Sequence, residues 1–278
     1  LTPLFPQLLN TSAILRSVSW NGSVFLIMGD KLSSSSPGTT LLYEYVPSKH
    51  ELLNVSYLLP QAFRNVTDCC TNPLEEVVSA KGVFYLALQT PGGFEMGSIN
   101  GGYFTSINPN LPVDFKLFST NHDFMTYSNG SIFLYGGLQS GGAVVYMINL
   151  SDLSSQEIFY SDYGQIVAGA SFENGYAVSF QNDGSGNLYI VLKNGENWDA
   201  INLTGLIPST WSIVQAIGQA EHEGKILYLL SDENNTNVEE CGAIIFMPPY
   251  YYVTFAEKGL ATGIEWSVSL SNGQYFAS

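Results

Sequence analysis

Short segments in which apolar and polar residues alternate recur along the whole chain, and each turns over at a glycine. Alternation with a period of two is typical of a β-strand with one buried face, and the Asn-Gly or Lys-Gly pairs at several turns tolerate the positive φ that tight hairpins need. The pattern therefore predicts a series of hairpins. Their turning segments are residues 17–22, 78–82, 125–130, 170–175, 219–224 and 268–273.

These turns recur at a nearly constant spacing. The intervals are 60, 48, 45, 49 and 49 residues, measured between Gly22, Gly82, Gly130, Gly175, Gly224 and Gly273. Two hairpins in a period of this length are typical of a β-propeller blade, a four-stranded sheet that is repeated around a ring. Helical periodicity is nearly absent, since even segment 205–217 is interrupted by Pro208. The chain is therefore predicted to be an all-β, six-bladed β-propeller.

Each blade is expected to hold an apolar second strand, then a third and a fourth. Second strands are predicted at 24–28, 83–88, 132–135, 176–180, 225–230 and 274–277, third strands at 41–46, 103–107, 144–148, 188–192 and 243–247, and fourth strands at 51–55, 115–119, 157–160, 199–203 and 251–255. A single domain, residues 1–278, would contain blades at about 13–60, 76–120, 123–163, 166–207, 212–259 and 263–278.

Residues 131–150 resemble a kelch repeat. An apolar strand precedes the pair Gly136-Gly137, and Tyr146 stands in the following strand, as in that family. Other blades match the pattern in part, through Met28-Gly29-Asp30, Tyr43, Tyr45 and Trp198. The resemblance implies a kelch-like propeller that binds through loops at either end of the ring. It implies a fold rather than an activity.

The sixth period is incomplete, because only segments 264–270 and 274–277 precede the last residue. Segment 4–9, inside an expected closing strand at 1–12, would add one strand to that blade. A three-stranded blade, a chain cut from a longer one and a strand donated by another subunit remain alternatives for the position still open. Because an unpaired strand edge is a pairing template, donation between subunits would produce a ring or a filament.

Charge narrows the range of partners. The chain has 9 Lys plus Arg against 24 Asp plus Glu, a net charge of -15, and only 12% charged residues. A phosphate backbone requires clustered basic side chains, so nucleic acid is excluded as a partner. The longest apolar runs, such as 24–28 and 226–230, have the length of strands and not of a membrane-spanning helix.

Eight Asn-x-Ser/Thr triplets point to N-glycosylation and hence to an extracellular or cell-surface location. They are about twice as many as chance predicts from 21 Asn and 46 Ser plus Thr residues. The alternative explanation is that Asn and Ser are favoured in β-turns. A chain that begins at Leu1 without Met also suggests a removed leader or a trimmed sequence. The acceptors would be Asn10, Asn21, Asn54, Asn65, Asn129, Asn149, Asn202 and Asn234.

Three cysteines leave one thiol unpaired within the chain. A disulfide between Cys241 and either Cys69 or Cys70 is expected in an oxidising compartment, with a ring between the two neighbours or three free thiols as alternatives. No His stands near them at the spacing of a zinc motif, so neither a metal nor another cofactor is expected.

No catalytic constellation is apparent. His50, His122 and His222 fall in three different blades, and Arg is limited to Arg16 and Arg64. Galactose oxidase, a kelch-type enzyme, needs His and Tyr copper ligands and a Tyr joined to a Cys, which this pattern does not offer. Sialidase-type propellers carry a Ser-x-Asp-x-Gly-x-x-Trp motif that is missing. A sialic-acid mutarotase-like channel would need charged residues around it. Arg16, in a predicted innermost strand, would be one of them, although a cation at a strand end is the simpler interpretation.

Two segments have other candidate roles. Asp232, Glu233, Glu239 and Glu240 surround an Asn-rich loop with oxygen ligands for Ca²⁺, although their spacing fits no ligand motif and a solvated loop is the simpler interpretation. The aromatic cluster Tyr250, Tyr251 and Tyr252 would stack on sugars or on a partner, or else pack between blades.

These patterns together predict a secreted, N-glycosylated surface, structural or adhesion protein that acts through binding and assembly, without being an enzyme. Its partners would be other protein subunits or cell-surface glycans. Surface or filament proteins of archaea and virion proteins resemble it loosely in composition. The alternative is a glycan-active or sugar-binding propeller, either a mutarotase-like enzyme or a lectin.

Overall fold

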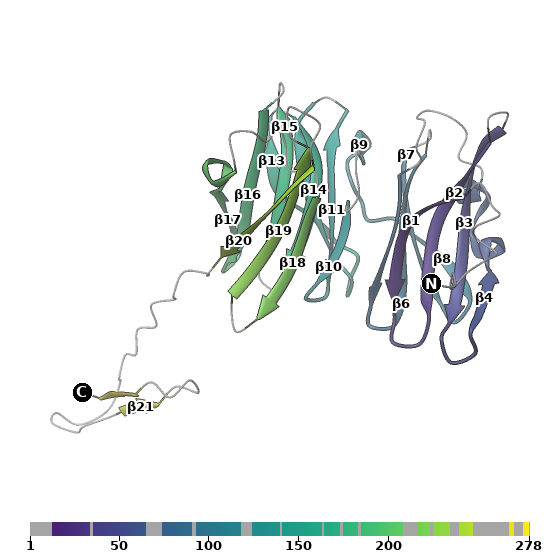
Figure 1. Ribbon diagram of the computed structural model, residues 1–278, viewed down its shortest axis with the longest axis horizontal. Coiled ribbons are helices and arrows are strands. Elements are labelled where there is room, and N and C mark those ends of the chain that lie inside the picture. Colours follow the sequence, from purple (N-terminus) through teal and green to yellow (C-terminus); the bar gives the residue numbers. More distant parts are fainter. Residues whose placement is uncertain are drawn as a thin grey trace. The chain divides into compact units, whose positions relative to one another are not determined.

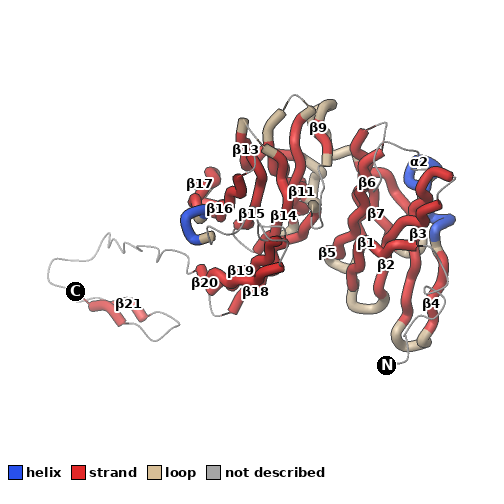
Figure 2. The backbone as a smooth tube through the Cα atoms, turned by 45° about the horizontal axis from the view of Figure 1, so that its top comes forward, coloured by secondary structure: helices blue, strands red, loops and turns tan. Residues whose placement is uncertain are grey.

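The structure is a computed structural model in which strands make up most of the chain (Figure 2). It divides into two units, Leu1–Phe246 and Met247–Ser278, which are described separately. It describes residues 13–33, 36–64, 74–90, 93–117, 124–139, 141–162, 164–172, 175–182, 185–207, 216–222, 225–233, 239–246, 267–269 and 275–277.

The first unit is a series of antiparallel sheets, in each of which consecutive strands lie side by side (Figure 1). The first sheet is β1 (Ala13–Trp20), β2 (Phe25–Ser33), β3 (Ser36–Val46) and β4 (Glu51–Asn54), and the second is β5 (Leu74–Ala80), β6 (Val83–Thr90), β7 (Gly93–Asn100) and β8 (Tyr103–Ile107). The third is β10 (Met125–Ser128), β11 (Ser131–Leu138), β12 (Ala143–Asn149) and β13 (Ser155–Ser161), with β9 (Phe115–Lys116) added beside β11.

The fourth sheet is β14 (Gln165–Phe172), β15 (Gly175–Asn182), β16 (Ser185–Asn194) and β17 (Asn197–Asn202), and the fifth is β18 (Ala216–His222), β19 (Lys225–Glu233) and β20 (Glu239–Phe246). Short helical turns follow two of the sheets: η1 (Ser56–Leu58), α2 (Gln61–Arg64) and η2 (Thr204–Leu206). In the second unit β21 (Ser267–Ser269) pairs with β22 (Tyr275–Ala277), where the sequence predicts its last hairpin.

The first strands of consecutive sheets are neighbours. β1 lies beside β5, β5 beside β10, β10 beside β14 and β14 beside β18. We call β1, β5, β10, β14 and β18 the inner strands. Among the described strands each sheet thus meets the next through its inner strand, which is how the blades of a propeller succeed one another.

Two of the predicted hairpin turns are confirmed by the backbone conformation of their residues. Lys81 and Gly82 have φ values of 50° and 80°, and Asn129 and Gly130 have 44° and 81°. Two consecutive residues with positive φ form the turn whose twist matches that of the flanking strands. Gly22 also has a positive φ, at 97°, within a longer connection.

The second sheet differs from the sequence prediction. Segment 103–107 was expected to be its third strand and 115–119 its fourth, but β7 is the third, β8 is the fourth, and β9 joins the third sheet. The sequence pattern did not predict β7, because its sequence, GFEMGSIN, has no continuous apolar run. The Gly136 of the kelch-like pair lies under β9, where a Cβ atom would overlap the carbonyl oxygen of Lys116 and the ring of Phe115.

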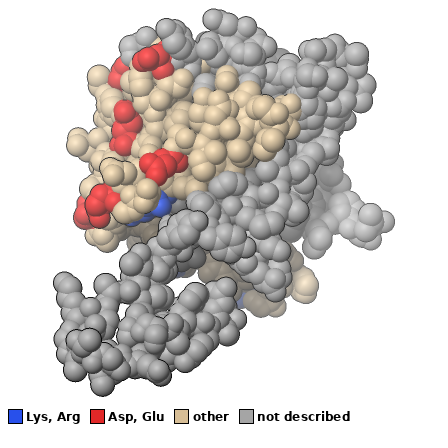
Figure 3. Space-filling model, turned by 90° about the vertical axis from the view of Figure 1, so that its left-hand side faces the viewer, with Lys and Arg blue, Asp and Glu red and all other residues tan. Residues whose placement is uncertain are grey.

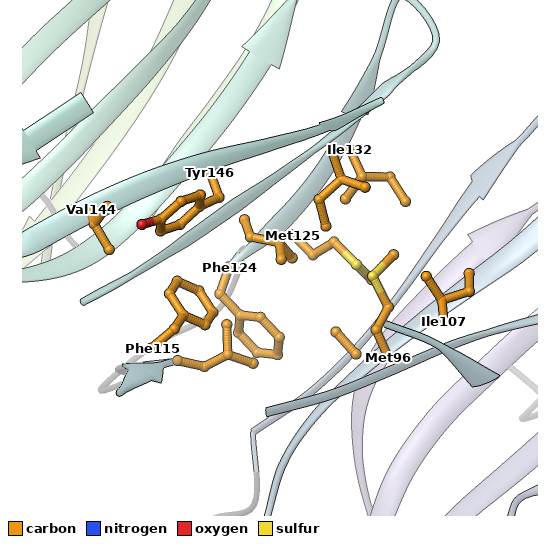
Figure 4. Close-up of a cluster of buried hydrophobic side chains, with 12 residues drawn as sticks. Met96, Ile107, Phe115, Phe124, Met125, Ile132, Val144 and Tyr146 are labelled. Carbon is orange, nitrogen blue, oxygen red and sulfur yellow. The ribbon is translucent and has the colours of Figure 1, made fainter. Parts of the chain in front are cut away.

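The core consists of apolar clusters between consecutive sheets. One of them joins the second and third sheets through Met96, Ile107, Phe115, Phe124, Met125, Ile132, Val144 and Tyr146, with Phe115 set edge-on against Tyr146 (Figure 4). The all-β prediction is therefore confirmed. The predicted closing strand at 4–9 and the fourth strand at 251–255 lie outside the described residues.

Candidate functional site

Two side chains on inner strands hydrogen-bond to the backbone of the next sheet. The Ser17 hydroxyl of β1 accepts the N–H of Val77 at 3.1 Å and donates to its carbonyl oxygen at 3.3 Å. The Glu76 carboxylate of β5 accepts the N–H of Met125 of β10 at 2.8 Å. All three hydrogen bonds join inner strands, so they hold neighbouring sheets together.

Glu76 is a buried acid that sequence reasoning missed. It is 8% exposed, and a buried carboxylate on an inner strand is where a propeller enzyme would place a general acid or base. One of its oxygens, however, is engaged by the Met125 amide, and a hydrolytic pair would need a second carboxylate at a suitable distance. The signal in the sequence was a Glu pair inside the apolar strand 74–80.

A second inner-strand hydroxyl has the opposite environment. The Ser171 hydroxyl of β14 is buried and has no hydrogen-bond partner among the described residues. A buried hydroxyl without a hydrogen-bond partner costs free energy, so this side chain is expected to lower the stability of the fold. No acid or base is hydrogen-bonded to the Ser171 hydroxyl in the part of the chain that the structure describes, and no group of metal ligands occurs there, so we assign it no catalytic role.

Two carboxylates, Glu157 and Asp114, influence the buried Tyr146 of the third sheet. The Tyr146 hydroxyl donates to Glu157 Oε2 at 3.2 Å. Burial, the charge of Glu157 and its hydrogen bond, and the charge of Asp114 together raise the pKa of Tyr146 to about 12. A phenol with so high a pKa stays protonated at neutral pH, so the group acts as a hydrogen-bond donor and not as a base.

One face of the first sheet, which we call the aromatic face, carries four aromatic side chains together with Val18 and the buried Ile27. The aromatic residues are Trp20 and the half-buried Phe25, Tyr43 and Tyr45. Trp20, Phe25 and Tyr45 are directly opposite one another on three adjacent strands, with ring centroids 4.5 Å apart for the first pair and 6.3 Å for the second. Trp20 is 44% exposed and Val18 is 61% exposed. Exposed aromatic and apolar residues in one row are typical of a recognition surface.

The opposite face of the first sheet packs on the second sheet through Leu26 and Met28. In the second sheet the two faces are likewise divided, since Leu86 packs toward the first sheet and Ala87 toward the third. The clusters that join consecutive sheets through described residues include no side chain of the aromatic face. This face therefore has the position of a blade-to-blade surface without a described neighbour.

Two of the predicted glycosylation triplets occupy equivalent places in the first and fourth sheets. Asn54 and Asn202 each end the fourth strand, and each side-chain oxygen accepts the N–H of the residue two positions later, Ser56 at 3.0 Å and Thr204 at 2.8 Å. The hydroxyl of that residue then accepts a third-strand N–H: Leu42 to Ser56 at 2.9 Å, and Leu188 to Thr204 at 3.1 Å. The triplets thus have a structural role that is independent of any glycan.

The other described triplets also lie in turns. Asn129 has positive φ in the β10–β11 hairpin, and Asn21 accepts the N–H groups of Ser23 and Val24, both at 2.9 Å. Asn149 accepts both the N–H and the hydroxyl of Ser151, at 2.9 and 2.8 Å. Asn10, Asn65 and Asn234 lie outside the described residues. Turn geometry accounts for these residue types, and occupancy by glycans stays a prediction.

Several predicted residues cannot be placed. Cys69, Cys70, His122, Tyr250, Tyr251 and Tyr252 lie outside the described residues, so the disulfide and the aromatic cluster stay predictions. The backbone of Cys241 lies in β20 opposite Ser231. His50 is in the turn between β3 and β4 of the first sheet, with φ of 54°, and His222 ends β18 of the fifth sheet.

The acidic residues proposed for Ca²⁺ lie at the ends of β19 and β20 that border the connecting segment 234–238, where Asp232 is opposite Glu240 and Glu233 is opposite Glu239. No group of three or more His, Cys, Asp or Glu side chains that could hold a metal ion occurs among the described residues. Acidic side chains are scattered over the face shown in Figure 3, with few basic ones among them. No helix in the described part of the chain is long and apolar enough to cross a membrane.

No model of a known protein family matches the sequence, and no curated protein is similar to it in sequence. Solved structures are similar in fold. One is the soluble aldose sugar dehydrogenase of Escherichia coli in its apo form, with a TM-score of 0.52, 11% identity, and coverage of 86% of this chain and 84% of that one. Another is the β-propeller domain of the Trilobed protease from Pyrococcus furiosus, reported to have an open velcro topology, with a TM-score of 0.50, 13% identity, and coverage of 83% and 66%.

A third similar structure is the acylaminoacyl peptidase of Pyrococcus horikoshii, with a TM-score of 0.50, 12% identity, and coverage of 84% of this chain. The chain spans only 36% of that peptidase. At these identities the likeness concerns the fold alone. Together with the succession of four-stranded sheets, it shows that the chain has a β-propeller fold.

Proposed function

We propose that the chain is a carbohydrate-binding β-propeller that acts outside the cell as an adhesion module. The observation that carries this proposal is the aromatic face of the first sheet, with Trp20, Phe25 and Tyr45 in one row. Binding modules need an exposed surface of defined shape, whereas enzymes need converging acids or bases. Glu76 is the buried acid found on the described inner strands, and it is bonded to Met125.

The chemistry of the aromatic face suits a sugar. Aromatic ring faces offer apolar area to the C–H faces of a pyranose, and the hydroxyl groups of Tyr43 and Tyr45 can hydrogen-bond to sugar hydroxyls. A net charge of -15 repels anionic saccharides, which favours neutral ones. One of the proteins with a similar fold is a sugar dehydrogenase, which supports sugars as the class to test first.

The finer architecture is also part of this proposal. The ring would be kelch-like and would have six blades, with β21 and β22 as the first two strands of the last one. Residues 1–12 or a strand from another subunit would complete that blade. Sugar binding by the aromatic face requires that this ring stays open beside the first sheet. N-glycosylation and an extracellular location are proposed on the strength of the eight Asn-x-Ser/Thr triplets.

Assembly is the second candidate function, and a specific observation favours it. The aromatic face has the position that, in the second and third sheets, is covered by the preceding sheet. A blade from another subunit would cover the same residues that we assign to sugar binding. Contact of this head-to-tail kind builds rings or filaments.

Replacing Trp20 separates the two candidates. We expect Trp20→Ala to weaken binding of neutral oligosaccharides, measured by isothermal titration calorimetry after a glycan-array screen, by about tenfold or more, because one stacked aromatic side chain contributes about 1 to 2 kcal/mol. Tyr103→Ala is the matched control, because Tyr103 is 78% exposed on β8, outside the aromatic face.

Light scattering of the native protein supplies the second measurement. A monomer that binds a neutral sugar and loses it on Trp20→Ala supports the carbohydrate proposal. An oligomer that dissociates in Trp20→Ala, with no sugar bound by either form, would replace it with assembly. Loss of binding in Tyr103→Ala and Trp20→Ala alike would contradict the assignment of the aromatic face.

A further inference from the structure

Four described Asn-x-Ser/Thr triplets share one side-chain conformation. In each, the Asn Oδ1 accepts the backbone N–H of the residue two positions later, at 2.8 to 3.0 Å: Asn21 with Ser23, Asn54 with Ser56, Asn149 with Ser151 and Asn202 with Thr204. This bond turns the amide oxygen toward the backbone. The amide nitrogen Nδ2, the atom that a glycan would be attached to, therefore points away from the turn.

The hydrogen-bond acceptor of Nδ2 differs between these four asparagines. Asn21 Nδ2 donates to the carbonyl oxygen of Gly82 at 3.4 Å, and Asn202 Nδ2 donates to the Tyr189 hydroxyl at 3.1 Å. For Asn54 and Asn149, Nδ2 has no hydrogen-bond partner among the described residues. Asn54 is also exposed.

We propose that Asn54 and Asn149 are N-glycan acceptors of the folded chain and that Asn21 and Asn202 are not. The inference rests on the proposed extracellular, glycosylated character of the protein and deepens it by naming the sites. An Nδ2 already held by a protein acceptor must give up that bond before it can react, whereas a free Nδ2 does not.

The reaction is a glycosyl transfer from a lipid-linked sugar phosphate or pyrophosphate. The Asn Nδ2 attacks C1 of the sugar, and a new C–N bond replaces the C1–O bond to phosphate. The lipid phosphate leaves with the electron pair of the broken bond. Nδ2 loses one of its two protons to a base of the transferase, so the product is a neutral secondary amide.

The first and fourth sheets provide a matched pair for this inference. Asn54 lies opposite Tyr43 on the third strand, just as Asn202 lies opposite Tyr189. The turns that follow are alike, down to the hydroxyl that accepts a third-strand N–H. No hydrogen bond joins Asn54 to Tyr43 in the described residues, while Asn202 and Tyr189 are bonded. The Tyr189 hydroxyl is therefore the difference to be tested.

The test is site-specific occupancy, measured by mass spectrometry of glycopeptides from the full chain secreted by its natural host. We expect the ratio of glycosylated to unmodified chains to be at least about fivefold higher at Asn54 and Asn149 than at Asn21 and Asn202, the factor that one net hydrogen bond supplies. Tyr189→Phe should raise that ratio at Asn202 about fivefold. Tyr43→Phe is the control and should leave Asn54 unchanged.

Equal occupancy of Asn54 and Asn202 in the unaltered chain would overturn the inference, and this comparison needs no variant. A folded Tyr189→Phe variant with unchanged occupancy of Asn202 would overturn it as well. Glycans found elsewhere with Asn54 and Asn149 empty would contradict the choice of sites and leave the glycosylated character standing. A secreted chain without any glycan would contradict both.

Discussion

The carboxylate of Glu76 on β5 accepts the backbone N–H of Met125 on β10, with Oε2 and N 2.8 Å apart. Burial makes the loss of either partner of such a bond costly. The bond lies between the inner strands of two sheets that also meet through apolar side chains and through a hydrogen bond from the Leu117 N–H to Gln89 Oε1. A buried acid in this place can hold two blades in register.

Removing the Glu76 carboxylate should destabilise the protein. We expect Glu76→Ala to lower the free energy of unfolding by about 2 to 3 kcal/mol, because the buried N–H of Met125 loses its acceptor. Glu76→Gln keeps an amide oxygen in place and should cost about 1 kcal/mol or less. Urea unfolding of the three proteins measures the difference. Equal losses in both variants would show that the bond to Met125 is not what the carboxylate contributes.

Ser17 and Ser171 both lie on inner strands, but replacing each by Ala should affect stability differently. Ser17→Ala should lower stability by about 1 to 2 kcal/mol, because the Val77 N–H loses its acceptor. Ser171→Ala should leave stability unchanged or raise it by about 1 kcal/mol, because its buried hydroxyl has no hydrogen-bond partner in the part of the chain that the structure describes. Thermal unfolding of both variants tests this, and a large loss in Ser171→Ala would reveal a partner for that hydroxyl.

Gly169 lies directly under the ring of Tyr135. A Cβ atom on Gly169 would stand 2.5 Å from the ring carbons Cδ1 and Cε1, closer than real contacts allow. Tyr135 is fully buried and cannot swing into solvent. We expect Gly169→Ala to cost about 2 to 3 kcal/mol by overpacking, measured by urea unfolding. Gly205→Ala, where nothing lies within 4 Å, is the control and should cost less than about 1 kcal/mol.

The Tyr146 phenol should make stability depend on pH in alkaline solution. Its pKa is raised from the ordinary 10.0 to about 12, first by burial and then by Glu157. The folded chain therefore binds a proton that the unfolded chain has released, so this stabilisation is complete below pH 10 and is lost as the pH rises toward 12. In Tyr146→Phe the free energy of unfolding should therefore fall by about 1 kcal/mol less between pH 10 and pH 12 than it does in the unaltered protein.

Glu157→Gln provides the accompanying control for Tyr146. Without the negative charge the phenol should titrate at a lower pH than in the unaltered protein, yet still above its ordinary value, because burial is the larger cause. Ultraviolet absorbance of tyrosinate follows the titration. A Tyr146→Phe variant whose stability falls with pH as steeply as before would contradict the assignment.

The hydroxyl groups of Ser56 and Thr204 should matter for stability even without glycans. Ser56→Ala removes the acceptor of the Leu42 N–H and should cost about 1 to 2 kcal/mol, while Ser56→Thr keeps the hydroxyl, as Thr204 does in the fourth sheet. Urea unfolding of chains made without glycans gives the comparison. Equal stability of Ser56→Ala and Ser56→Thr would mean that the triplet is not a structural element of the first sheet.

Local chemistry determined much of the fold. The alternation of residues and the turn at Lys81-Gly82 predict a hairpin, and the structure has β5 and β6 there, with positive φ at both turn residues. Such features depend on neighbours a few positions away in the sequence, so they can be recognised without knowledge of the rest of the molecule. The same holds for Asn129-Gly130.

The sequence predicts less well which strands lie side by side. Segment 103–107 is a strand in the sequence prediction and in the structure, but its place is fourth and not third, since β7 intervenes. Segment 115–119 also differs from its prediction, because residues 115–116 form β9, which pairs with β11 of the third sheet. A strand sequence specifies which of its faces is apolar, and it does not specify which strand lies beside it.

The candidate sites show the same division. The sequence by itself determined where Asn-x-Ser/Thr triplets, aromatic residues and acids stand along the chain. Only the tertiary structure decided that Glu76 is buried beside Met125, that Trp20 and Tyr45 belong to one row, and that Asn202 Nδ2 is held by Tyr189. Each of these depends on segments that meet only in the folded chain, because hydrogen bonds and burial are set by distance in space and not along the sequence.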